Sequence, residues 1–194
     1  PKVRVDGTSL ENDRWKLEFD PATGFMKSYF DKKNELEVLR RPGGRLTGYE
    51  DKSDTWSHNI FKFDKVLGDM KLVSISVLEE GPVRSAIRVK YRYNQSFVIQ
   101  DFRLYQELEY VETHVKVDWR EPQTMLKVRY PVNFNFRRPT YEIPYGYIEK
   151  SANGEEEPGQ SWFDFTGEHF KKGCMYGLAI ANDCKYSYSM DVDE

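Results

Sequence analysis

Regular alternation of side chains along the chain is the feature that most constrains its fold. In residues 84–93, Ser, Ile, Val, Tyr and Tyr alternate with Arg, Ala, Arg, Lys and Arg. Residues 111–119 and 14–20 alternate in the same way. Successive side chains of a β-strand point to opposite faces, so each segment predicts a strand with one dry and one wet face.

Further strands are expected between clear turn signals. The segments 70–80, 97–110, 125–136 and 174–183 are rich in apolar residues but alternate less regularly, and residues 185–194 open another strand. The turn signals DPATGF, DKKNE, RPGG, EEGP and EPQT separate them, and no segment keeps a helical period over a dozen residues. Antiparallel sheets of this kind bury one face each, which predicts an all-β sandwich.

Composition limits the function classes open to the chain. Its 194 residues suit one domain, predicted here over 1–194. With 29 basic and 32 acidic residues and a net charge of -3, no general attraction to nucleic acid is expected. No apolar run approaches the roughly 20 residues that cross a bilayer, and no signal peptide is visible. Cys174 and Cys184 suggest free thiols of a cytoplasmic protein, although a single bridge between them stays open.

Most catalytic signatures are missing from the sequence. No nucleophile elbow and no glycine-rich phosphate loop occur, and no His, Cys and carboxylate cluster has the spacing of metal ligands, so neither catalytic nor metal-binding residues are predicted. His58, His114 and His169 lie far apart in sequence, and structural roles are favoured for all three. His58 is the least certain, because acids and a Trp surround it.

Two stretches combine rings with carboxylates, as glycoside chemistry requires. One is GYEDKSDTWSHN, which contains Trp56, and the other is residues 141–165, which resemble a loop and contain Trp162. Each of these two Trp side chains suits a core position as well as a sugar platform. Glu155, Glu156 and Glu157 predict a solvated acidic turn, because runs of charge are usually solvated.

Six stretches in order give the chain a family resemblance. They are LENDRWKLEFDPATGFMKSYFDKKNELEVL, EDKSDTWSH, EEGPVRSAIRVKYRYNQS, HVKVDWREPQTMLKVRYPV, YEIPYGYIEKSANGEEEPGQSWFDF and YGLAIANDCKYSY. Together they run through nearly the whole length. On these residues the chain resembles the C-terminal β-domain of the α-mannosidases of glycoside hydrolase family 38.

The resemblance implies a fold and a parent enzyme. The fold is an antiparallel supersandwich like that of galactose mutarotase, and the chain is expected to be an incomplete fragment of that domain. The parent is expected to hydrolyse α-mannosides with retention of configuration, assisted by zinc. The family's nucleophile, acid/base carboxylate and zinc ligands come from an N-terminal catalytic domain and a helical segment, so none of them is carried onto this chain.

The resemblance also implies substrate-side contacts. The segments EDKSDTWSH and YEIPYGYIEK match segments near the rim of the family's active site. On that basis, the candidates for contacts with an α-mannoside glycan are Asp54, Trp56, His58, Tyr145 and Lys150.

The resulting hypothesis is a non-catalytic fragment of a cytoplasmic α-mannosidase that is inactive alone. A stand-alone carbohydrate-binding or structural β-sandwich module is the alternative. A mutarotase-like epimerase is a third possibility, which would require a His general acid and a carboxylate base in one pocket. The only pairs available for it are His58 with Glu149 or with Asp164.

Overall fold

The computed structural model describes residues 3–136 and 138–191, and within these ranges it contains strands and turns but no helix. It therefore offers no helical segment, in the described part, that could span a membrane. Adjacent strands pair antiparallel in every sheet. This confirms the prediction of an all-β, antiparallel chain.

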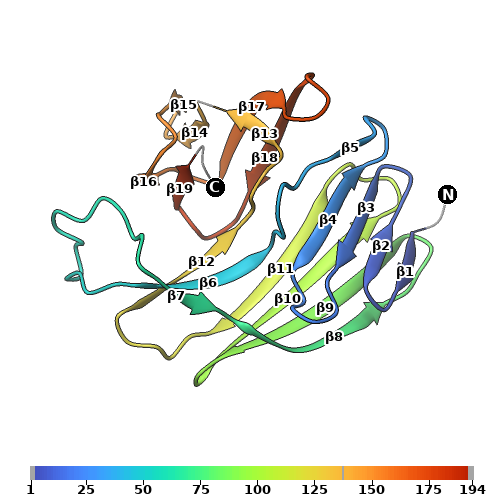
Figure 1. The fold of residues 1–194 in the computed structure, drawn as a ribbon, viewed down its shortest axis with the longest axis horizontal. Coiled ribbons are helices and arrows are strands. Elements are labelled where there is room, and N and C mark those ends of the chain that lie inside the picture. The colour runs from blue at the N-terminus through green and yellow to red at the C-terminus, as the bar shows by residue number, and fades with distance from the viewer. Residues whose placement is uncertain (1–2, 137, 192–194) are drawn as a thin grey trace. The chain divides into compact units, whose positions relative to one another are not determined.

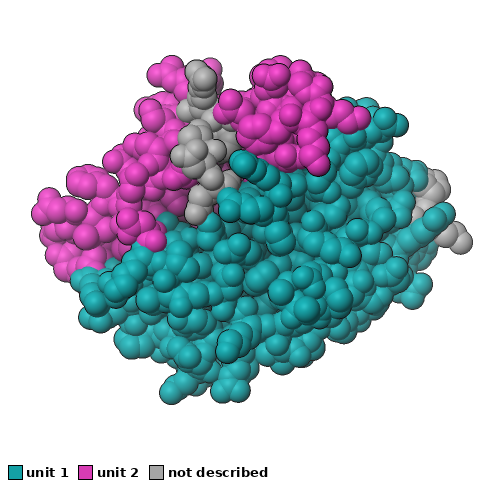
Figure 2. Space-filling view, in the orientation of Figure 1, with its two compact units in different colours: residues 1–52, 65–131 teal, residues 53–64, 132–194 magenta. Residues whose placement is uncertain are grey.

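The chain forms two compact units, coloured separately in Figure 2. Unit 1 comprises residues 1–52 and 65–131, and unit 2 comprises residues 53–64 and 132–194. The prediction of one domain over 1–194 stays a prediction.

Unit 1 holds three sheets (Figure 1). Its strands are β1 (Arg4–Asp6), β2 (Ser9–Glu11), β3 (Trp15–Phe19), β4 (Met26–Asp31), β5 (Leu36–Glu37), β6 (Arg45–Glu50), β7 (Val66–Asp69), β8 (Lys71–Glu79), β9 (Arg84–Tyr93), β10 (Ser96–Tyr105), β11 (Val111–Asp118) and β12 (Thr124–Arg129). The sheet orders are β1-β2-β3-β4-β5, β11-β10-β9-β8 and β12-β6-β7.

Two sheets of unit 1 stack as a sandwich, because each has one apolar face to bury. The β1–β5 sheet covers one face of the β8–β11 sheet (Figure 1). The Phe19 and Phe102 ring centroids lie 4.8 Å apart across this core, and Phe25 stacks on Tyr91 at 5.7 Å. The buried Tyr91 hydroxyl donates a hydrogen bond to the Gly24 carbonyl at 2.8 Å.

The predicted dry face of β9 is buried from Ser85 to Tyr91, whereas the predicted wet face is exposed only in the second half of the strand, because Ala86 is also buried. Ile87, Val89 and Tyr91 are fully buried, whereas Lys90 and Arg92 are exposed on the outer face. The dry side of this strand therefore follows directly from the period-two pattern.

Unit 2 is built from seven strands and the segment 53–64. The strands are β13 (Phe134–Phe136), β14 (Thr140–Ile143), β15 (Gly146–Glu149), β16 (Asn153–Pro158), β17 (Trp162–His169), β18 (Met175–Ala181) and β19 (Ser187–Asp191). In one sheet β17 pairs with β18 along its length on one side and with β13 and β14 in succession on the other, and β14 also pairs with β15. β16 and β19 form a separate two-stranded sheet.

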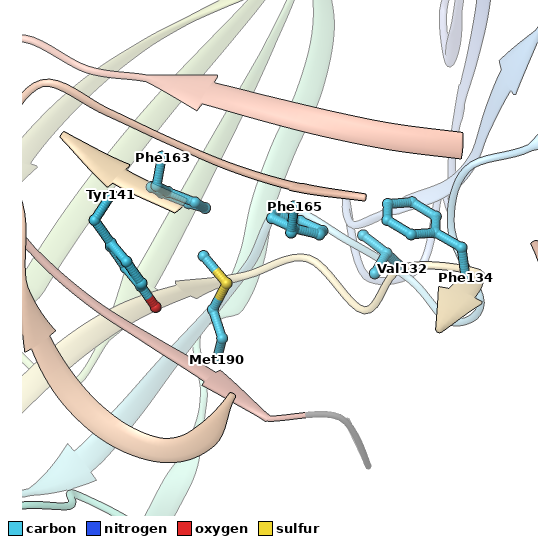
Figure 3. Close-up of a cluster of buried hydrophobic side chains, with 6 residues drawn as sticks. All are labelled: Val132, Phe134, Tyr141, Phe163, Phe165 and Met190. Atoms are coloured by element: carbon cyan, nitrogen blue, oxygen red, sulfur yellow. The ribbon is translucent and has the colours of Figure 1, made fainter. Parts of the chain in front are cut away.

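A small aromatic core holds unit 2 together (Figure 3). Its members are Val132, Phe134, Tyr141, Phe163, Phe165 and Met190. Alternate residues of β17 supply two of the rings: Phe163 and Phe165 are buried, and the Asp164 side chain between them points to the opposite face.

The structure corrects the expectation of a loop over residues 141–165. This stretch forms most of β14 and the strands β15 and β16, and it enters β17. The prediction of a solvated acidic turn at Glu155–Glu157 is also wrong, because these residues lie within β16 and are only partly exposed. Pairing with β19 supplies the hydrogen bonds that a glutamate-rich segment does not signal by itself.

Two other strand predictions need adjustment. The segment 125–136 is interrupted around Pro131, whose ring nitrogen cannot donate to a ladder, so β12 ends at Arg129 and β13 starts at Phe134. The strand predicted from 185–194 is present as β19, and residues 192–194 lie outside the described range.

Candidate functional site

The loop that contains Asp54, Trp56 and His58 is organised by one carboxylate. Asp54 Oδ1 accepts hydrogen bonds from the backbone N–H of Trp56 at 3.0 Å and of His58 at 3.3 Å. Its Oδ2 lies 2.7 Å from His58 Nδ1. Short Asp side chains form such turns because they reach the backbone two residues on. Asp54 therefore shapes the loop as well as binding His58.

The electrostatics of this loop follow from the same contacts. The hydrogen bond from His58 holds the pKa of the Asp54 carboxyl below its usual value, with help from backbone N–H groups. His58 Nε2 makes no hydrogen bond to a described residue, and both side chains are solvent-accessible. The loop thus presents an ionised carboxylate and an accessible imidazole nitrogen.

Trp56 is the most exposed Trp of the chain, at 80%. Of the two roles open to it, a core position is excluded. Trp162, by contrast, is partly buried in β17. A solvent-facing indole beside a carboxylate and an imidazole suits stacking on the apolar face of a sugar.

Tyr145 lies at the tip of the β14–β15 hairpin, with a fully exposed ring. Its φ is 67°, in the left-handed region that non-glycine residues rarely adopt. Pro144 precedes it, which matches the order of proline and positive φ in a type II turn. Tyr147, in β15, adds a second exposed ring on the same hairpin.

Lys150 is held mainly by other residues of the chain. Its Nζ lies 2.5 Å from Glu157 Oε2 and 5.6 Å from the centre of the Tyr141 ring. The side chain is 22% exposed. Its predicted substrate contact stays a prediction, but the structure gives it a structural role that the sequence did not indicate.

Strand β16 contacts both the 53–64 segment, which holds Asp54, Trp56 and His58, and the side chain of Lys150. Near its start, the Asn153 carbonyl accepts from Lys62 Nζ at 2.5 Å, and the Glu156 N–H donates to the Phe61 carbonyl at 2.8 Å. These bonds attach the end of the 53–64 segment, and Glu157 then binds Lys150. No hydrogen bond or ion pair among the described residues joins the Asp54–His58 loop directly to Tyr145 or Lys150.

The other histidines have different surroundings. His169 is buried, and its Nδ1 accepts from the backbone N–H groups of Lys171 and Lys172 at 3.3 and 3.2 Å, which fixes the β17–β18 turn. His114 lies on the exposed face of β11, opposite Asp101. Neither arrangement resembles a catalytic pair.

The epimerase pairing finds no support in the geometry. The carboxylate that contacts His58 is Asp54, whereas Glu149 forms an ion pair with Arg138 at 3.6 Å. Asp164 lies in the middle of β17, opposite Thr140 and Ala179.

Cys174 and Cys184 are exposed free thiols. They flank β18, whose seven residues span about 23 Å at ~3.3 Å per residue. Disulfides join Cα atoms about 4.4–6.8 Å apart. A bridge between these two residues is therefore incompatible with the strand that separates them.

The stacked antiparallel sheets of unit 1 define a β-sandwich. Comparison with known proteins gives the family. Residues 10–194 match the model of the glycosyl hydrolases family 38 C-terminal domain, so this chain belongs to that family. The resemblance predicted from the sequence is confirmed.

Individual relatives agree with this assignment. The chain is 27% identical over 187 residues to alpha-mannosidase G of Dictyostelium discoideum, covering 87% of this chain and 17% of that protein. It is 33% identical over 89 residues to alpha-mannosidase 2C1 of Homo sapiens, covering 42% of this chain and 8% of that protein. The chain therefore spans less than a fifth of these relatives.

A solved structure shows the same fold. All of this chain aligns with 28% of the chain of an alpha-mannosidase from Enterococcus faecalis V583, with a TM-score of 0.69 and 10% sequence identity. At this identity the likeness concerns the fold, and it confirms the predicted all-β architecture.

Proposed function

We propose that this chain is the non-catalytic β-domain of a longer α-mannosidase, whose catalytic carboxylates lie in an N-terminal domain of the same polypeptide. The observation that carries the proposal is the family match over residues 10–194. The chain spans 17% of its Dictyostelium relative, which leaves ample length for a separate catalytic domain. The activity proposed for the whole protein is hydrolysis of α-mannosidic bonds with retention.

The described carboxyl groups with a clear pKa shift do not have the shift that a glycosidase acid requires. A glycosidase needs one carboxylic acid whose pKa is raised, so that it can protonate the leaving group. Hydrogen bonds from neighbouring donors instead lower the pKa of eight described carboxyl groups. These are Asp6, Glu18, Glu50, Asp54, Asp101, Glu112, Asp118 and Glu121.

The zinc expected for the parent enzyme does not fit the described residues of this chain. A catalytic zinc site takes three protein ligands from His, Cys and carboxylate side chains. The structure brings no group of three or more such residues together within residues 3–136 and 138–191. We therefore assign no step that involves zinc to this chain.

The role proposed for the chain's surface is contact with the glycan. Trp56 offers a stacking face, His58 Nε2 and the Asp54 carboxylate offer hydrogen bonds to hydroxyl groups, and Tyr145 offers a second ring. Lys150 would contribute indirectly, by binding Glu157 in the strand that anchors the 53–64 segment.

The proposal predicts that the 194-residue chain has no α-mannosidase activity. With an aryl α-mannoside as substrate, release of the aryl alcohol should stay at the rate of the buffer, with or without added zinc. The longer polypeptide encoded by the same gene is the positive control. Turnover by the 194-residue chain alone would refute the non-catalytic role.

A single observation, the exposure of the Trp56 side chain, favours the alternative of a stand-alone carbohydrate-binding module. A module of that kind would bind mannose or oligomannose saturably at sub-millimolar concentration, with a change in Trp fluorescence. A Trp56→Phe variant keeps an aromatic ring but removes the exposed reporter. Saturable binding that Trp56→Phe silences would favour the module over the domain.

Tyr145 provides a test that separates stability from function. Tyr145→Gly removes the cost of a left-handed residue, partly offset by the greater freedom of glycine in the unfolded chain, so stability should rise by about 0.5–1 kcal/mol. Glycan contact should weaken, which would raise KM of the longer enzyme. Tyr145→Phe is the control, because it keeps both ring and strain. A loss of stability in Tyr145→Gly would contradict this interpretation.

A cytoplasmic location is also proposed. Two exposed cysteines that stay unbridged are more typical of a reducing compartment than of a secreted protein.

A further inference from the structure

Strand β18 has a strand neighbour on one side only among the described residues. The Cys174 carbonyl accepts from His169 N–H at 2.8 Å, and Asn182 N–H donates to the Ser161 carbonyl at 2.7 Å, so even-numbered residues bond toward β17. Because backbone groups alternate along a strand, the odd-numbered residues point away from β17. They are Met175, Gly177, Ala179 and Ala181, and all four are exposed.

This edge lacks the features that protect sheet edges from pairing, which are charges, prolines and bulges. Its sequence, MYGLAIA, has neither charge nor proline, and its pairing with β17 runs without a register shift. Other long edge strands are protected. The edge strand β8 has two register shifts against β9, and β11 and β12 carry charged side chains.

The apolar side of β18 is also incompletely covered. Tyr176, Leu178 and Ile180 pack against the aromatic core of unit 2 but remain only partly buried. On the opposite face, Gly177, Ala179 and Ala181 are small. A strand added at this edge would extend the core with apolar residues on one face and would meet little side-chain bulk on the other.

We infer that this edge of β18 is completed by another β-strand, which comes from the part of the α-mannosidase polypeptide that lies outside residues 1–194. The inference rests on the proposed function, because it requires a longer polypeptide. This chain covers 28% of the Enterococcus faecalis chain that it matches over its full length, so most of such a polypeptide is available to supply the strand. The added strand is expected to alternate, with apolar side chains beside Tyr176, Leu178 and Ile180.

Hydrogen exchange of single backbone amides tests the inference, with the 194-residue chain and the longer polypeptide compared under one condition. The amides of Gly177, Ala179 and Ala181 should exchange rapidly in the short chain and at least roughly tenfold more slowly in the long one. The amides of Tyr176, Leu178 and Ile180 bond to β17 and should be protected in both, which provides an internal control.

A substitution at position 179 gives an independent readout. Ala179→Pro removes an N–H that points away from β17 and leaves the β17 ladder intact. It should lower Tm of the longer polypeptide by several degrees and change Tm of the 194-residue chain little. Ala179→Val keeps the N–H group and is the matched control, with no comparable difference between the two lengths.

Several results would overturn the inference. One is rapid exchange of the three edge amides in the longer polypeptide. Another is their protection in the 194-residue chain together with a dimeric mass, which would assign the edge to a second copy. Equal loss of Tm at both lengths in Ala179→Pro would also overturn it, as would a reading frame with no coding sequence beyond these residues. Activity of the longer polypeptide on an aryl α-mannoside is measured separately, so failure of the proposed function is recognised independently.

Discussion

Replacing Arg88 by alanine is expected to lower the free energy of unfolding by about 3 kcal/mol. Asp101 is 1% exposed, although it lies on the outer face of β10. Arg88 binds it through two hydrogen bonds, Nε to Oδ1 at 2.7 Å and Nη2 to Oδ2 at 2.8 Å. Without the guanidinium, a carboxylate remains buried without its main partner. Urea unfolding monitored by Trp fluorescence measures the loss.

Arg120→Ala is the matched control for this prediction. Arg120 binds Asp118 through the same pair of atoms at 2.9 and 2.8 Å, but both side chains are more than half exposed. Exposed ion pairs contribute about 0–1 kcal/mol. Equal losses in Arg88→Ala and Arg120→Ala would show that burial of Asp101 is not the source of the effect.

The loss of stability in Arg88→Ala should depend on pH in a defined way. The hydrogen bonds from Arg88 hold the pKa of Asp101 below the value of 3.8 usual for Asp. A carboxyl whose pKa is lower in the folded state stabilises the fold above its unfolded pKa, and the contribution is lost as the pH falls through the folded pKa. The difference between the parent chain and Arg88→Ala should therefore be constant near neutral pH and shrink below about pH 4.

Gly24→Ala is expected to destabilise unit 1 by about 2–4 kcal/mol, through backbone strain and overpacking together. Gly24 has a φ of 73°, and an added Cβ would lie 2.6 Å from Leu72 Cδ1 and 2.7 Å from Val89 Cγ1. Any relaxation would also disturb the bond from Tyr91 to the Gly24 carbonyl. Thermal and urea unfolding of the 194-residue chain provide the measurement.

Gly7→Ala is the control for the packing part of this effect. A Cβ at Gly7 meets nothing within 4 Å, and its φ is not in the left-handed region. Its stability should change by less than about 0.5 kcal/mol, as for ordinary surface positions. A similar loss in both variants would contradict the packing argument at Gly24.

Much of unit 1 could be predicted from sequence, because strands such as β3 and β9 bury the apolar side chains of their alternating patterns. The alternation in residues 84–93 and 111–119 identified β9 and β11, but the dry face predicted for β11 is wrong, because Val115 and Val117 are exposed. The strands of unit 2 were harder to recognise. Their formation depends on pairing between distant segments, as when β16 pairs with β19. The turn at Pro144 could not be recognised from the sequence, because the residue with positive φ in this turn is Tyr145 rather than glycine.

The candidate site was predictable in its composition but not in its connections. Asp54, Trp56 and His58 were grouped as candidates because they lie within five residues, and the structure places all three in one loop. Nothing in the amino-acid pattern indicated that Lys150 binds Glu157, because Lys150 precedes β16 and Glu157 lies within it. The pattern also gave no sign that β16 anchors the 53–64 segment.

The assignment of residues 53–64 to unit 2 has a practical consequence for dissecting the molecule. The backbone passes between the two units three times, after residues 52, 64 and 131. Expression of 132–194 alone would therefore leave behind the donor at Lys62 and the acceptor at Phe61 that bind β16. A single proteolytic cut between residues 53 and 64 would leave residues 65–131 of unit 1 covalently joined to unit 2 at residue 131, and packing within unit 1 would hold residues 1–52. Limited digestion should therefore nick this protein without releasing either unit under native conditions.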